Sequence, residues 1–201
     1  MKNNIIQFTK EKESKVRAMC LLLEKIKGKS AIDLLREYDI ELSPPINVSL
    51  LLDKMGVSVI AKDFSVIERE VEWEDKPILG AAISKGDSLA IFYNKTDTYN
   101  RKLFTIAHEL GHCCKHADNL KIEHIELRTD NNDLDAHEIE ANIFAGELLV
   151  PEVVLKPIYD SFILPSLKNL SSIFCVSTNV MAARLDYLKL AYLKDAVIDE
   201  E

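Results

Sequence analysis

Two histidines and a glutamate near the middle of the chain have the types and spacing of a metal site. His108 and His112 lie four positions apart, and Glu109 follows the first. On an α-helix, residues four apart share one face with Cβ atoms about 5–6 Å apart, so both imidazoles can reach one ion. A catalytic zinc site holds the ion with three protein ligands and leaves a position for water. Glu109 can take that water's proton, as in the His-Glu-x-x-His pattern of zinc hydrolases.

The same spacing also fits an amphipathic helix with two exposed histidines and no chemical role. The histidine face, however, carries Phe104, Ala107 and Gly111, which favour burial. Buried imidazoles need polar partners. A small residue such as Gly111 also lets a second backbone approach closely. These neighbours favour the metal site over the exposed helix.

A second helix, expected from Asp135 to Val150 and ended by Pro151, offers the third ligand. Glu138 shares a face with small or apolar residues that permit close helix packing: Ala141, Asn142, Ala145 and Leu148. Glu140 lies on a bulkier face with Ile143, Phe144 and Glu147. We therefore predict Glu138 as the ligand and Glu140 as a solvated or supporting carboxylate.

Alternatives remain for several residues near this site. The spacing of Asp135 and Glu138 also fits a helix-capping box. Asn142, one turn after Glu138, can hydrogen-bond a zinc ligand and fix its orientation. His137 points about 100° away from Glu138 and is an alternative ligand or oxyanion donor. His116 would lie about 12 Å along the axis from His108, too far for the same ion, so we interpret it as a helix-end residue.

Composition predicts one globular domain, with room for a small appendage, in a chain of 201 residues that is 47% hydrophobic and 29% charged. The polar first fifteen residues resemble no signal peptide, and no run of 18 apolar residues is present, so we expect a cytoplasmic protein without a membrane span. The four cysteines lack a paired metal spacing and are interpreted as reduced core residues. A net charge of −8 disfavours a broad nucleic-acid surface and favours a protein or peptide partner.

Before the histidine helix, the pattern predicts helices within residues 11–38, interrupted near Gly28 and Ser30. A short helix should follow over 47–55, closed by Gly56, and then a strand over 57–61. A further strand is expected over 67–73. Residues 78–84 and 88–93 have the signature of a hairpin. Its second strand, or the neighbouring one, is either a free edge that pairs with substrate or an ordinary internal strand.

After the hairpin, the histidine helix should begin near residues 96–98 and end near Lys115 or His116, followed by a loop over 117–132. Residues 166–188 resemble a helix-turn-helix. The second of these helices offers few basic groups, Arg184 and Lys189, so a packing or substrate-docking role is favoured over DNA reading.

Two motifs together resemble the ImmA/IrrE family of zinc metallo-endopeptidases. The first runs from Phe104 through His112, and the second from Glu138 to the Leu-Leu-x-Pro sequence that ends at Pro151. The similarity extends over about residues 45–190. The chain departs from the family pattern at Leu103, where a basic residue is common, and at Val150, where methionine is usual. Neither departure affects the predicted chemistry.

The resemblance implies a zincin-like fold and a zinc site in which Glu138 is the family's third ligand. It also implies the substrate, because family members cleave helix-turn-helix repressors and so relieve repression in mobile-element, phage or stress responses. Other members accompany toxin–antitoxin or phage modules. The alternative to an endopeptidase is therefore a metal-stabilised module that binds a repressor or toxin without cutting it.

The sequence thus predicts an α+β, zincin-like metallopeptidase with a small twisted sheet packed on the active-site helix. Zn²⁺ would be held by His108, His112 and Glu138, and Glu109 would be the catalytic base. We expect a helical arm over 1–44, the peptidase domain over 45–160, and helix-turn-helix-like helices with an acidic tail over 161–201. The expected partner is a helix-turn-helix repressor, with no direct binding to nucleic acid or membrane.

Overall fold

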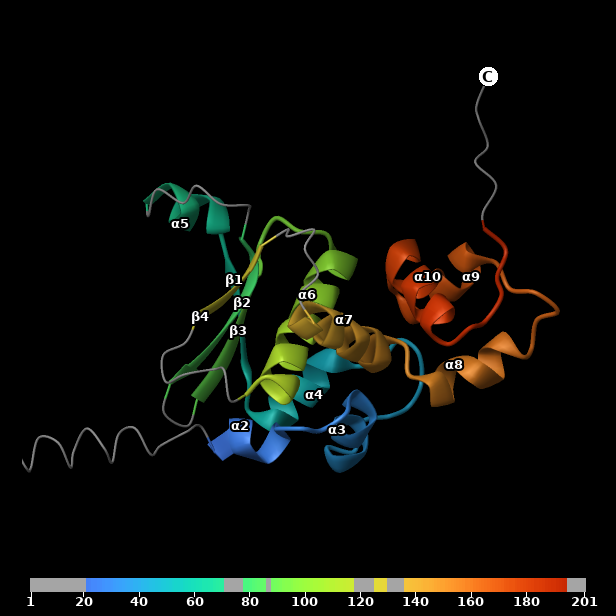
Figure 1. The fold of residues 1–201 in the computed structure, drawn as a ribbon, viewed down its shortest axis with the longest axis horizontal. Helices are drawn as coiled ribbons and strands as arrows, with labels where there is room; N and C mark the ends of the chain where they lie inside the picture. The colour runs from blue at the N-terminus through green and yellow to red at the C-terminus, as the bar shows by residue number, and fades with distance from the viewer. Residues whose placement is uncertain (1–20, 71–77, 86–87, 118–124, 130–135, 195–201) are drawn as a thin grey trace, which may run out of the picture.

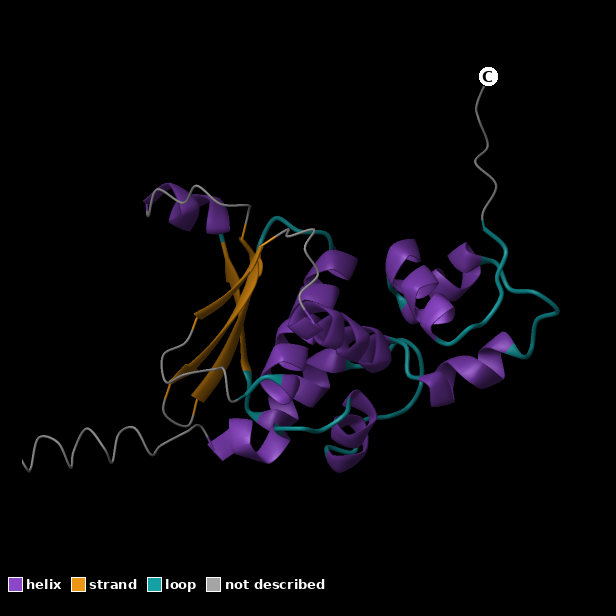
Figure 2. Cartoon of the chain, viewed as in Figure 1, coloured by secondary structure: helices purple, strands orange, loops and turns teal. Residues whose placement is uncertain are grey.

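Helices and one small sheet make up the fold, which confirms the predicted α+β, zincin-like class. The computed structural model describes residues 21–70, 78–85, 88–117, 125–129 and 136–194. The sheet forms one layer, helix α6 (Tyr99–Lys115) packs on one of its faces, and α7 (Ala136–Leu149) packs against α6 (Figure 1). The C-terminal helices lie beyond α7, on the side away from the sheet (Figure 2). Among the described residues, no helix combines the length and apolar composition needed to cross a bilayer.

The sheet contains β1 (Ser58–Lys62), β2 (Ile78–Lys85), β3 (Ser88–Asn94) and β4 (Ile125–Thr129), in the order β1-β3-β2-β4. The predicted hairpin is confirmed, because β2 and β3 pair antiparallel, with Gly80 opposite Tyr93 and Ala82 opposite Ile91. β1 runs parallel to β3, and β4 runs antiparallel to β2. β2 and β3 are therefore interior strands, and β1 and β4 are the edges among the described strands.

This order decides one alternative and corrects one expectation about strands. The hairpin strand over 88–93 is the internal strand of the two possibilities, with both sides paired, and not a free edge. The loop expected over 117–132 is wrong in part, because it contains β4. β4 alternates apolar and polar residues, Ile-Glu-Leu-Arg-Thr, and its ladder partner β2 lies some forty positions earlier in the chain. Pairing over that distance leaves no local signal beyond the short alternation.

The strand expected over 67–73 is also wrong where it can be checked. Residues up to Glu70 belong to α5 (Phe64–Glu70), and 71–73 lie outside the described residues. Asp63 begins this helix: its carboxylate accepts from Ser65 Oγ at 2.6 Å and its carbonyl from Val66 N at 3.2 Å. The helix-start signal at Asp63 therefore outweighs the alternation of glutamates that follows.

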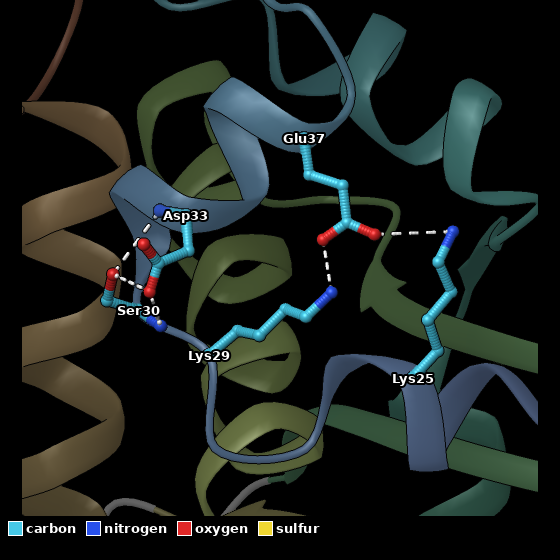
Figure 3. A network of polar contacts seen from close by, with 5 residues as sticks. All are labelled: Lys25, Lys29, Ser30, Asp33 and Glu37. Atoms are coloured by element: carbon cyan, nitrogen blue, oxygen red, sulfur yellow. Dashed lines mark hydrogen bonds and ion pairs between the residues drawn. The ribbon is translucent and has the colours of Figure 1, made fainter.

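The N-terminal helices follow the predicted break. α2 (Leu21–Ile26) and α3 (Ala31–Glu37) are separated by Gly28, which has a φ of 75°, and by Ser30, which caps α3. Figure 3 shows the reciprocal capping box of Ser30 and Asp33, and Glu37 bridging Lys25 and Lys29. The predicted helix over 47–55 is confirmed as α4 (Val48–Met55), capped by Asn47 and closed by Gly56 in the left-handed region. Residues 11–20 lie outside the described part of the chain.

Residues 166–188 do form two helices joined by a tight turn. α9 (Leu167–Phe174) ends at Cys175, which has a φ of 53°, and α10 (Thr178–Tyr187) begins after Ser177. Before them, α8 (Glu152–Tyr159) follows Pro151. Arg184, one of the few basic residues of α10, is only 6% exposed, and its Nε donates to the carbonyl of Val150 at 3.0 Å. It therefore attaches α10 to the end of α7 instead of facing a ligand in solution.

One hydrophobic core joins these elements. Its buried side chains come from the N-terminal helices, the sheet, the α6–α7 pair and the C-terminal helices, and include Leu23, Leu34, Leu51, Ile91, Leu110, Phe144, Leu170 and Leu185. The core therefore draws on all three segments expected from the sequence, and the boundaries at residues 44 and 160 stay a prediction.

Candidate metal centre

Helix α6 places His108 and His112 on one buried face. The helix begins at Thr98, whose side chain accepts from the backbone N–H of Arg101, and ends at His116. The two Nε2 atoms lie 2.9 Å apart, and the residues are 0% and 1% exposed. Two buried imidazole nitrogens therefore meet at one point, as the four-residue spacing predicts.

Helix α7 brings Glu138 to the same point. Its Oε2 lies 3.3 Å from His108 Nε2, and its Oε1 lies 3.1 Å from His112 Nε2. This approach depends on Gly111, because a Cβ there would lie 3.1 Å from the carbonyl oxygen of Ala141 and 3.2 Å from the Phe144 Cβ. A small residue at 111 lets the two helices pack closely enough for Glu138 to reach the histidines.

The three side chains fit a tetrahedral divalent ion. Ligand atoms held about 2.0–2.1 Å from such an ion lie about 3.3 Å from each other. The corresponding atoms of His108, His112 and Glu138 are separated by 2.9, 3.3 and 3.1 Å. Among the described residues, these three make up the group of histidines, cysteines and carboxylates with metal-site geometry. Two nitrogens and one carboxylate also leave a fourth position for a water or substrate oxygen.

Asn142 fixes the orientation of His108, and this predicted hydrogen bond is confirmed. The Oδ1 of Asn142 lies 2.9 Å from His108 Nδ1. An amide oxygen can only accept, so in neutral His108 the proton is on Nδ1 and the lone pair of Nε2 points at His112 and Glu138. Lone pairs converging at this distance need a proton or a cation between them. The donor set therefore has the chemistry of a metal-binding site.

The protonation state of Glu138 agrees with such a role. When His108, and then His112, carries a proton on Nε2, it donates to the carboxylate and holds the pKa of Glu138 well below its ordinary value. Glu138 is therefore ionised at neutral pH, which is the form in which a carboxylate binds metal.

Glu109 lies next to the ligands in sequence but points toward the sheet. It is fully buried, and a Cβ added to Gly80 on β2 would lie 2.8 Å from its Oε1 and 2.5 Å from Thr105 Cγ2. The space left by the absent side chain of Gly80 therefore holds the Glu109 carboxylate. This contact was not predicted from the sequence, although an isolated glycine within the apolar pattern of residues 78–84 is a signal for such a close approach.

A known protein family matches most of the chain, including these residues. Residues 52–186, from α4 to α10, match the sequence model of the IrrE N-terminal-like domain, Peptidase M78. The chain belongs to this family. The resemblance predicted from the two motifs is thus confirmed, and the family supports metallopeptidase activity. No curated protein matches the chain. The M78 match includes all three clustered side chains, whereas α2 and α3 precede it.

Glu140 and His137 were weighed as participants in the metal site, but both lie near a different histidine of this M78 domain, His116. Glu140 is half exposed, with Oε2 3.6 Å from His116 Nε2. The same nitrogen lies 3.2 Å from the His137 carbonyl oxygen, and the two rings have centroids 4.2 Å apart. Burial, and then His137 and His112, lower the pKa of His116. His116 is the C-terminal cap of α6, as predicted.

The cysteines that follow the motif lie in the core. Cys113 and Cys114 are both fully buried on α6, and burial raises the pKa of the Cys114 thiol to about 12. Neither thiol belongs to the group of described side chains with metal-site geometry. This confirms the interpretation of these two cysteines as core residues, whereas Cys175, at the C-terminal end of α9, is only partly buried. Cys20 lies outside the described residues.

Proposed function

We propose that this chain is a zinc-dependent endopeptidase that hydrolyses a peptide bond in a protein substrate, a helix-turn-helix transcriptional repressor. The observation that carries the proposal is the convergence of His108, His112 and Glu138 within 4.8 Å, beside Glu109 on the same helix. Membership of the M78 family supports the peptidase class. The identity of the metal and the substrate belong to the proposal.

In this proposal the chain's own residues hold the ion and move the proton. His108, His112 and Glu138 bind zinc, and Asn142 keeps the His108 ring in place. Bound zinc polarises the scissile carbonyl and lowers the pKa of a water toward neutrality. Glu109 accepts the proton of the attacking water and delivers it to the leaving amine. Its position against Gly80 limits the directions in which the carboxylate can turn.

The sheet offers a backbone surface for an extended substrate. Among the described strands β4 is an edge next to β2, and its residue 128 pairs with Gly80, whose backbone adjoins Glu109. An extended peptide that adds to an open edge gains main-chain hydrogen bonds whatever its sequence. We propose that the substrate pairs with β4, and not with the internal strand β3.

A repressor suits the charge of this chain. The net charge is −8 at pH 7, whereas a DNA-binding protein presents a basic surface to phosphate. Opposite charges speed the encounter of two proteins and favour correct orientation. Because Arg184 is buried, α10 has little basic surface with which to contact DNA. Residues 166–188 therefore suit a packing or docking role better than DNA binding.

The test is to incubate the zinc-loaded protein with the repressor encoded beside its gene and to follow fragments by mass spectrometry. Glu109→Gln should keep zinc and lower the cleavage rate by at least about 100-fold, the lower range for general acid–base catalysis. Glu140→Gln is the matched control and should cleave as the wild type does, because Glu140 faces His116 and solvent. A chelator should stop cleavage.

Two results would contradict the proposal in different ways. Full activity of Glu109→Gln would remove Glu109 from its role as the base. A stable, zinc-dependent complex without fragments would instead establish the alternative, a metal-stabilised module that binds a repressor or toxin without cutting it.

A further inference from the structure

A cavity of about 430 Å³ continues the face on which the metal centre lies. Phe104, four residues before His108, and Gly146, four residues after Asn142, both line it. Residues four apart share one helix face, so the cavity occupies the groove between α6 and α7 one turn beyond the ligands. Asn142 belongs to both places, because it bonds His108 and also lines the cavity.

Helix α10 closes the other side of this cavity. Val180, Ala183 and Tyr187 line it from α10, opposite Ile139 and Ile143 of α7. The hydrogen bond from Arg184 Nε to the Val150 carbonyl fixes α10 in this position. The walls are therefore mainly apolar and come from rigid helices, which are common features of a preformed ligand pocket.

One charged group, Arg184, also borders the cavity, and the carboxylates of Glu147 and Glu152 act favourably on its charge. Its guanidinium lies over the Tyr187 ring at 5.5 Å. On its other side it shares a second pocket with Glu147 and Glu152. These carboxylates offset the positive charge from outside the cavity, so the cavity does not call for an anionic ligand.

We propose that this cavity binds a large apolar side chain of the peptide substrate, one or two residues from the scissile bond. The inference rests on the proposed endopeptidase function. One helical turn from His108 to Phe104 spans about 6 Å at 1.5 Å per residue. An extended peptide advances about 3.3 Å per residue, so a chain lying over the metal centre brings its next or second-next side chain to the cavity. The volume falls within the range of about 300–1,000 Å³ typical of ligand sites.

The test uses binding as well as cleavage. Zinc-loaded, full-length Glu109→Gln protein selects ligands from a proteome-derived peptide library, and the best peptide is resynthesised with alanine, leucine, phenylalanine, tryptophan or aspartate at each position. Fluorescence anisotropy then gives each Kd. We expect one position at which leucine or phenylalanine binds roughly 10–200-fold more tightly than alanine, the range for hydrophobic pockets.

Two substitutions on α10 show whether this cavity causes the preference for leucine or phenylalanine. Ala183→Leu, added to Glu109→Gln, fills the cavity and should remove the preference for leucine or phenylalanine at that position. Ala182→Leu makes the same change at a neighbouring residue outside the cavity lining and should retain it. Ile143→Ala widens the cavity and should shift the preference toward tryptophan. Thermal unfolding of each variant confirms that it is folded.

Several outcomes would overturn the inference. These are a library that yields no bound peptide, a preference for aspartate, and identical profiles for Ala183→Leu and Ala182→Leu. The endopeptidase proposal is judged separately by fragments from the wild-type protein. If the wild type cleaves but Ala183→Leu keeps the preference for leucine or phenylalanine, only the pocket is refuted. If Ala183→Leu removes that preference but the wild type does not cleave, the peptidase proposal is refuted and the pocket stays a binding site.

Discussion

Two clusters of histidine and glutamate lie along the same pair of helices, yet only one of them has the geometry of a metal centre. His108, His112 and Glu138 point their ligand atoms at one place within 3.3 Å of each other. One turn further along α6, His116 has its Nε2 near the His137 carbonyl oxygen and 3.6 Å from the half-exposed Glu140. The residue types are alike in both clusters, so composition does not distinguish them.

The difference lies in which atoms converge. In the first cluster, Asn142 Oδ1 accepts a hydrogen bond from Nδ1–H of His108, which leaves the Nε2 lone pair for an ion. In the second, a main-chain carbonyl oxygen faces the only nitrogen of His116 that approaches Glu140. A metal site thus needs lone pairs that meet at one point, and the partner behind His108 directs one of them there.

The largest contrast is expected between His112→Ala and His116→Ala. Removing a ligand should weaken zinc binding by more than about 100-fold, beyond the range seen for groups that only support ligands. His116→Ala should bind one zinc with wild-type affinity. Competition with a fluorescent chelator measures both. Equal loss in the two variants would make the second cluster part of the site.

Gly80→Ala should come next and should separate catalysis from metal binding. The added methyl group would lie 2.8 Å from Glu109 Oε1, so the carboxylate must move. A shift of about 1 Å can lower a rate by about 100-fold. We expect kcat to fall by about that factor while zinc content is unchanged. A fall in zinc content equal to the fall in kcat would mean that the substitution disturbs α6 as a whole.

Asn142→Ala should lower zinc affinity by about 10–100-fold, because it removes the acceptor that orients His108. Glu140→Ala, on the same helix, is the control from the second cluster and should leave the affinity unchanged. Chelator competition distinguishes the two. An unchanged affinity for Asn142→Ala would show that packing alone holds the imidazole.

The smallest effects concern the helix packing beneath the first cluster. Gly111→Ala brings a Cβ to 3.1 Å from the Ala141 carbonyl oxygen, and that backbone cannot move aside cheaply. We expect the free energy of unfolding to fall by about 1 kcal/mol or more, as for overpacked cores. In Gly146→Ala the added Cβ would lie 3.7 Å from Arg184 Cδ, an ordinary contact. This substitution should raise the free energy of unfolding by up to about 1 kcal/mol, because alanine has a higher helix propensity than glycine. Urea titration measures both, and equal signs would contradict the packing account.

Local signals predicted much of the fold. The ends of α4 follow from Asn47 and Gly56, and the start of α6 follows from Thr98, because caps depend on one or two residues. The histidine pair also follows from spacing along a single helix. Such features depend only on neighbours in sequence, so the sequence alone suffices for them.

Features that depend on distant partners were predicted less well. β4 was missed because its pairing partner β2 is remote in sequence, and residues 67–70 were given the wrong structure because Asp63 starts a helix there. The choice of Glu138 over Glu140 relied on small residues at the helix contact, and the structure does bring Glu138 to the histidines. The contact of Gly80 with Glu109, and the cavity under α10, require the tertiary arrangement.

The most direct measurement is a crystal structure of the zinc-loaded protein with anomalous data at the zinc edge. The account predicts one peak, bound by His108 Nε2, His112 Nε2 and a carboxylate oxygen of Glu138, with Asn142 still bonded to His108. A peak at His116 and Glu140, or no ordered zinc between the two helices, would contradict it.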